Sequence, residues 1–162
     1  MSAVTMTWDL VTDQFQGSIS PQDFQRIAPD GLPLFDEWST AIYVVGQSGQ
    51  IYWGGLFVSS DFTGPDWTIN CIGFRGYANG NIYTGPEYIQ TTIDPLDAVR
   101  YIWSWLQAQP NGLIGLVADG TESGTSVGTA ASPYTLAWYD ANDCGQEITN
   151  LAQGTPFDLS EV

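Results

Sequence analysis

The stretch DPLDAVRYIWSWLQAQ, residues 94–109, carries the clearest structural signal in the chain and predicts one long helix. Asp94 is a favourable N-cap, and Pro95 fits the first helical position, where a missing N–H costs nothing. Pro110 and Gly112 end the run. The sequence therefore marks both ends of this helix, and the other predicted elements can be placed around it.

The polar residues of this helix form one narrow stripe, because they recur at intervals of three and four. They are Asp97, Arg100, Ser104 and Gln107. The other positions are mostly apolar or aromatic, and Trp103 and Leu106 are expected on the buried face. Each large side chain that is fully buried contributes about 1.5–3 kcal/mol. We therefore expect the helix to be covered on more than one side.

Downstream of this helix the pattern predicts alternating short elements. GLIGLVADG (112–120) and PYTLAWYD (133–140) are predicted strands, separated by a Gly/Ser/Thr-rich surface loop at 121–132 that is expected to be mobile. Asp143 is the expected N-cap of a second helix, which Gly154 ends. Residues 157–162 resemble a strand without a later partner, which indicates a truncated chain or pairing with another subunit.

Upstream, the residues favour β-structure. Residues 4–10 alternate in hydrophobicity, a short helix is expected after Ser20, and residues 40–62 predict a hairpin with a bulge or bend at Gly54–Gly55. Residues 67–78 predict a further strand, and meander pairing is the simplest topology. The expected fold is α+β, with a mostly antiparallel β-barrel in residues 1–92 and a smaller α+β segment in residues 93–162.

Composition restricts the chemistry. The 162 residues include 18 acids and three arginines, with no lysine and no histidine, so the net charge is −15. Nine acids precede residue 93 and nine follow it, so the charge is spread along the chain. Duplex DNA and anionic membranes would be repelled. Catalysis through an imidazole base, a Schiff-base lysine or a P-loop lysine is excluded, and we expect no enzymatic activity.

Carboxylate chemistry and metal binding are the remaining possibilities. Asp36 and Glu37 are adjacent, but on an extended chain their side chains point apart, which disfavours a glycosidase pair. The segment from Asp140 begins like an EF-hand loop, yet Cys144 occupies a position that needs an oxygen ligand. Leu151 also replaces the bidentate acid. We expect no catalytic, cofactor or metal site.

Two other residue types leave alternatives open. Cys71 in a predicted strand and Cys144 at a predicted helix start are expected to be reduced thiols, although the spacing does not exclude a disulfide. The abundant aromatics either fill the core or stack on sugar rings in a carbohydrate-binding module. The candidates for such stacking are Trp53, Trp67, Tyr77, Tyr83 and Tyr88.

Three segments carry a family resemblance. They are WTINCIGFRGYANGNIYTG (67–85), DPLDAVRYIWSWLQAQPNGLIGL (94–116) and ITNLAQGTPFDL (148–159). Together they resemble minor tail proteins of long-tailed bacteriophages, particularly those of actinobacteria. In that family a strand ending in Gly-Phe passes through a Tyr-Thr-Gly turn into an Asp-Pro-Leu-Asp helix. The likeness covers roughly residues 40–162, and family members are considerably longer than this chain.

The resemblance implies a structural protein of the tail tip, similar to a baseplate hub, whose barrel domains form a ring that continues the tail tube. It implies a homotrimer in the virion, assembled in the host cytoplasm, that contacts the distal tail or tail-tube protein and the tape measure. DNA would pass through without specific binding. Carboxylates would line the lumen, with Arg26, Arg75 and Arg100 directed elsewhere, or the acidity serves only solubility. The alternative function is a carbohydrate-binding module for the host receptor.

Overall fold

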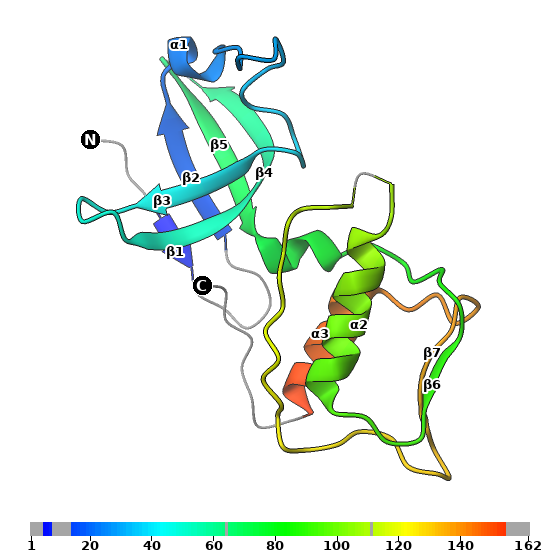
Figure 1. Cartoon of the computed structure of the whole chain (residues 1–162). Helices are drawn as coiled ribbons and strands as arrows, with labels where there is room; N and C mark the ends of the chain where they lie inside the picture. Colours follow the sequence, from blue (N-terminus) through cyan, green and yellow to red (C-terminus); the bar gives the residue numbers. More distant parts are fainter. Residues whose placement is uncertain (1–4, 8–13, 64, 111, 155–162) are drawn as a thin grey trace. The chain divides into compact units, whose positions relative to one another are not determined.

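The computed structural model (Figure 1) describes residues 5–7, 14–63, 65–110 and 112–154 of the chain. The chain divides between Tyr77 and Ala78 into two compact units. The sequence predicted a division near residue 92, which is 15 residues later than residue 77. The difference arises because Tyr83 and Tyr88 pack on the long helix, at ring-centroid distances of 4.8 Å from Trp105 and 3.7 Å from Tyr101.

The first unit is built on a five-stranded antiparallel sheet with the spatial order β1-β2-β5-β4-β3. Its strands are β1 (Thr5–Thr7), β2 (Gln14–Ile19), β3 (Ala41–Val45), β4 (Ile51–Thr63) and β5 (Asp66–Gly73). A single-turn helix, α1 (Pro21–Phe24), follows β2 with Ser20 as its N-cap, as predicted. A 3-10 helix, η1 (Phe74–Ala78), ends the unit. The mixed α+β class and the antiparallel character of the first part are confirmed.

The sheet contains the predicted meander and extends it. β3, β4 and β5 form the expected meander, and β2, for which no partner was predicted, lies beside β5. The pairing Phe15↔Cys71 places two buried apolar residues opposite each other, so the core face decides this arrangement. Within the described residues, no pairing connects β1 with β3, and barrel closure remains a prediction.

The expected bulge at Gly54–Gly55 lies elsewhere. Both glycines are regularly paired, with Tyr43 and Ile42, whereas the register shifts occur between Val44 and Val45 and beyond Phe57. Gly55 has a packing role, because an added Cβ would overlap the carbonyl oxygen of Ile72 on β5. Glycine is required there for close strand contact and not for a bend.

The core of the first unit lies on one face of the sheet and is mostly aromatic. Its buried residues are Phe15, Trp53, Phe57, Ile69 and Cys71. Phe15 and Trp53 stack with centroids 5.2 Å apart. Phe24 of α1 stacks on Trp67 at 4.2 Å, so the short helix covers one end of the sheet (Figure 1).

The second unit contains two helices and a two-stranded antiparallel ribbon. The elements are β6 (Tyr88–Gln90), α2 (Pro95–Gln107), β7 (Tyr134–Leu136) and α3 (Cys144–Gln153). α2 and α3 lie side by side, as Figure 1 shows. The predicted helix start is confirmed, because the Asp94 side chain accepts a hydrogen bond from the Leu96 N–H at 2.8 Å.

α2 is covered on most of its circumference, as its composition predicted. Between Pro95 and Gln107 only Asp97 and Ser104 are exposed. Leu106 is buried as expected, but Trp103 is only half-buried, and Ile102 holds the central buried position instead.

The two segments between α2 and β7 differ from their predictions. Residues 112–120 were expected to form a strand but contain none. The side-chain amide of Gln107 binds the backbone of Leu116 instead: its NH2 group donates to the Leu116 carbonyl oxygen, and its oxygen accepts from the Leu116 N–H. The loop at 121–132 was expected to be mobile, yet Ser123 donates two hydrogen bonds to Asp94 and Val127 pairs with Ile93. The side chains of Asp94, the N-cap of α2, and of Gln107, its last residue, therefore help to position these segments.

Candidate interaction surface

The longest stretch without charge in this acidic chain lies in β3, β4 and the turn between them. Residues 38–60 contain no Asp, Glu, Lys or Arg, although the whole chain carries a net charge of −15. This stretch covers all of β3 and most of β4. Because solvent-exposed surface normally carries charge, an uncharged exposed segment is a candidate contact region.

Four large apolar side chains of β3 and β4 within this stretch are exposed, each at more than half of its maximum area. They are Tyr43 and Val45 on β3, and Ile51 and Tyr52 on β4, and we name them the β3–β4 surface. Val45 pairs with Ile51, and Tyr52 is the extra residue of the bulge beside them. The bulge therefore adds a second aromatic ring to the surface.

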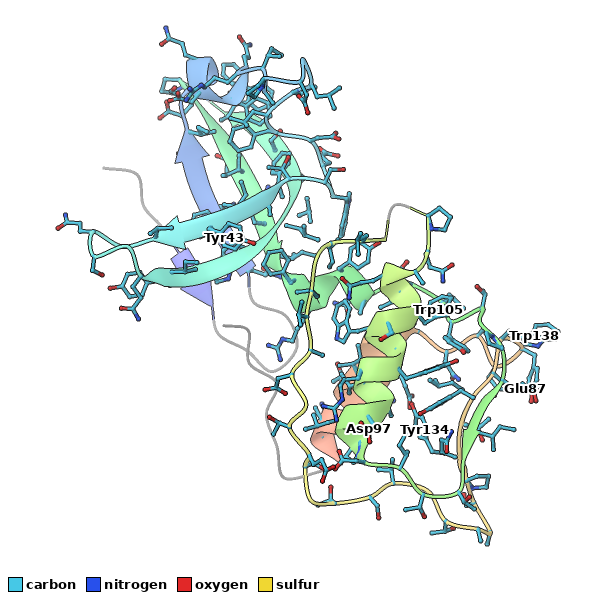
Figure 2. All side chains as sticks on the ribbon, viewed as in Figure 1. Tyr43, Glu87, Asp97, Trp105, Tyr134 and Trp138 are labelled. Carbon is cyan, nitrogen blue, oxygen red and sulfur yellow. The ribbon has the colours of Figure 1, made fainter. Side chains whose placement is uncertain are left out.

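Each of the two tyrosine rings lies over a glycine. Tyr43, labelled in Figure 2, pairs with Gly54, where a Cβ would lie 3.1 Å from its ring, and it contacts Phe74 at a centroid distance of 5.9 Å. The Tyr52 ring lies across Gly46, whose missing side chain leaves room for it. Both rings are thus supported before any partner binds, which lowers the entropy cost of binding.

The outer edge of β3 adds backbone groups to this surface. Within the described residues β3 pairs only with β4, so its other edge offers unpaired N–H and C=O groups. Natural sheets usually guard such edges with charged residues or proline, and β3 contains neither. The edge and its apolar neighbours are suited to pairing with another strand.

The aromatics predicted for sugar stacking do not share an exposed face. Trp53 and Tyr83 are buried, and Trp67, Tyr77 and Tyr88 are half-buried. Three of them lie in the first unit and two in the second. The Trp53 indole fills the core against Phe15. The structure therefore uses these residues mainly for packing.

The predicted acidic candidates also have structural roles or lie apart. Asp143 caps α3, with one carboxylate oxygen 2.9 Å from the Gln146 N–H and the other 2.7 Å from the Gly80 N–H. The helix-cap interpretation of this segment is confirmed. Asp36 and Glu37 are exposed at a turn before β3. Among the residues that the structure describes, no three potential ligands gather into a metal site.

The two cysteines are free and buried, one in each unit. Burial raises the pKa of Cys71 to about 11 and that of Cys144 to about 12. Both thiols therefore stay protonated near neutral pH and have little nucleophilic character.

The expected ion pair on α2 is present and is part of a larger contact. Arg100 donates to Asp97 at 2.7 Å and also to the carbonyl oxygens of Asp119 and Thr121. The guanidinium therefore binds the loop after α2 to the helix. Arg26 lies 3.8 Å from Asp23 in an exposed pair, which contributes little to stability.

The sequence interpretation missed two exposed aromatics at the end of β7. Trp138 and Tyr139 were placed in a strand, but β7 ends at Leu136 and both rings lie on the following turn. A signal was present, because Asn142 and Asp143 follow closely and mark a turn leading into a helix cap.

In the described part of the chain no helix is long and apolar enough to cross a membrane. Comparison of the chain with protein-family models, with curated proteins and with solved structures gave no match.

Proposed function

We propose that this protein is a structural component of a bacteriophage tail tip, and that copies of it form a ring through which DNA passes. The family resemblance of residues 40–162 suggests this role. The observation that carries the proposal is the β3–β4 surface, an uncharged apolar region on a chain with a net charge of −15. Copies of so acidic a chain repel one another, and an uncharged region is where they can come into contact at the lowest electrostatic cost.

The free edge of β3 suggests how the copies pair. A contact between the β3 edge of one copy and the β1 edge of the next is heterologous, and repeating it closes a ring when the rotation between copies divides a full turn. The barrel predicted for residues 1–92 would then be completed by assembly, because β1 and β3 are the two edges of the sheet. By resemblance the ring is a trimer that contacts the distal tail or tail-tube protein and the tape measure.

The acidic composition supports the passage of DNA. Each lysine or arginine that faces DNA adds a contact that releases counterions and holds the duplex. The chain has no lysine, and Arg100 is already occupied by Asp97 and two carbonyl groups. We propose that carboxylates line the lumen of the ring.

The first test is the mass of the protein in solution, measured by light scattering after size exclusion. We expect a multiple of 17.6 kDa for the wild type, and the monomer mass for Tyr43→Asp, because this change places a charge in the contact. Phe62→Asp is the matched control, since Phe62 is a similarly exposed aromatic near the far end of β4. A wild-type monomer at about 100 µM would contradict the assembly.

The second test addresses the location in the virion. Immunogold labelling with antibodies against this chain should mark the tail tip of particles that carry it. Label on the capsid, or intact tails without label, would contradict the proposed role even if the protein forms rings in solution.

A further inference from the structure

The turn after β7 holds two exposed aromatic rings and is closed by a backbone hydrogen bond. Trp138 is 60% exposed and Tyr139 is 56% exposed. The Asp140 N–H donates to the carbonyl oxygen of Ala137 at 3.1 Å and closes the turn. Ala141 then adopts a positive φ of 51°, which directs the chain toward α3. Trp138 and Tyr139 thus lie between the buried end of β7 and the N-cap of α3.

The two rings are nearly perpendicular. Their centroids are 5.4 Å apart and their planes meet at 80°. In this edge-to-face arrangement the rings support each other. Both side chains keep more than half of their area accessible, so aromatic faces remain available to a ligand.

Two carboxylates accompany the rings. Tyr88 pairs with Leu136, so Glu87 lies opposite Ala137, next to Trp138 (Figure 2). Hydrogen bonding to Glu87 and its charge raise the pKa of Tyr139, and Asp140 adds a smaller effect of the same sign. The hydroxyl of Tyr139 is thereby directed at the Glu87 carboxylate, and the remaining lone pairs of Glu87 and Asp140 are acceptors.

The second unit has no positively charged side chain available to pair with Glu87 and Asp140. Between residues 78 and 154 the sequence has one positively charged side chain, Arg100. It is held by Asp97 and by the carbonyl oxygens of Asp119 and Thr121, on the loop after α2. The turn after β7 therefore combines exposed ring faces with two carboxylates that no arginine of the same unit neutralises.

This combination favours a cationic, planar hydrogen-bond donor. Trp is the best side chain for cation–π contact, and a guanidinium group can stack on a ring while donating two parallel hydrogen bonds to a carboxylate. Anionic ligands would be repelled by Glu87 and Asp140. A neutral sugar could stack on Trp138 and donate hydroxyl hydrogen bonds to Glu87, but it would bring no positive charge to balance the two carboxylates.

We propose that the turn formed by Trp138, Tyr139 and Asp140, together with Glu87, binds an arginine side chain of a basic partner protein. The guanidinium stacks on the Trp138 ring and donates to the Glu87 carboxylate. This inference does not depend on the tail-tip proposal, because it concerns a different unit and a ligand that the ring contact does not use.

The test is a titration of the ¹⁵N-labelled full chain with the peptide acetyl-Gly-Arg-Gly-amide, followed by NMR. We expect shifts concentrated at the Trp138 indole N–H and at the amides of Glu87 and Tyr139. The same peptide with citrulline in place of arginine keeps the shape but loses the charge, and should bind at least about threefold more weakly. Added salt should weaken the arginine peptide only.

Matched variants separate this site from general attraction to an acidic protein. Trp138→Leu and Glu87→Gln should each weaken arginine binding at least about threefold. Trp38→Leu and Glu122→Gln, which change an exposed tryptophan and an exposed acid elsewhere, should leave it unchanged. Equal binding of the citrulline peptide, or shifts spread over all acidic residues, would overturn the proposal. A stronger, salt-independent response of this turn to chitotriose would replace it with a sugar site.

Discussion

At one helical position of the second unit, close packing requires a residue whose helix propensity is low. Gly145 is the second residue of α3, where alanine would be favoured by up to about 1 kcal/mol. However, a Cβ at Gly145 would overlap the side chain of Asn79 and lie 2.9 Å from its Cα. Packing and propensity therefore predict opposite signs for the same substitution.

We expect Gly145→Ala to destabilise the protein by about 1–3 kcal/mol, because the backbone of Asn79 cannot move away cheaply. Gly120→Ala is the control, since an added Cβ there meets nothing within 4 Å, and it should change stability by less than about 0.5 kcal/mol. Urea unfolding followed by tryptophan fluorescence measures both. A stabilised Gly145→Ala variant would show that propensity dominates.

Asp94 is an acid whose ionisation supports the fold. Its burial opposes ionisation, but hydrogen bonds from the Leu96 N–H and from Ser123 outweigh this effect and lower its pKa below 3.8. The carboxylate joins the start of α2 to the loop at 121–132. Because the folded-state pKa is lowered, this stabilisation is complete above pH 3.8 and is lost as the pH falls through the folded-state pKa.

Asp94→Ala should lower the free energy of unfolding at pH 7 by about 0.5–2 kcal/mol, through loss of the cap. The difference from the wild type should shrink at pH values below 3.8. Urea titrations at several pH values measure this trend. The exposed acid Glu122 gives the comparison, and equal effects of Glu122→Ala and Asp94→Ala at pH 7 would argue against the special role of Asp94.

At the scale of elements, the sequence predicted those structures whose signals are local. The N-caps Ser20, Asp94 and Asp143 were recognised because a short polar side chain precedes a helical run, and all three accept the expected N–H bond. The hairpin of β3 and β4 was recognised from its polar turn. Local chemistry is sufficient for such elements.

The failed predictions depend on contacts between distant residues. Residues 112–120 are rich in Leu, Ile and Val, which favours a strand, but Gln107 binds the backbone of Leu116 and the structure assigns no strand to this segment. The pairing of β2 with β5, for which no partner was predicted, follows from shared burial of Phe15 and Cys71, which are 56 positions apart. Trp138 was missed as an exposed residue because apolar character alone indicates burial.

α2 offers a direct test of how the second unit is stabilised. Ile102 is fully buried at the centre of this helix, whereas Trp103, first expected on the buried face, is half-buried. Ile102→Ala should cost about 2–5 kcal/mol, because it removes apolar contacts and leaves a cavity. Ser104→Ala, on the exposed side, should cost less than about 0.5 kcal/mol. Similar thermal midpoints for the two variants would contradict the observed packing.

At the scale of the whole molecule, charge and assembly are linked. Copies with a net charge of −15 repel one another over distances comparable to the Debye length, about 10 Å at 0.1 M salt. The proposed contact at the β3–β4 surface contains no charged residue, so its own strength does not depend on salt screening. Salt should then reduce the repulsion and leave the attraction intact.

We therefore expect self-association to increase as NaCl is raised from about 20 mM to about 500 mM, which is the opposite of an interface held by ion pairs. Sedimentation equilibrium at constant protein concentration measures the change in mass. Tyr43→Asp should remain monomeric at low salt, because the new carboxylate must be buried against an apolar partner. Dissociation of the wild type on adding salt would show that charged groups, and not the β3–β4 surface, hold the copies together.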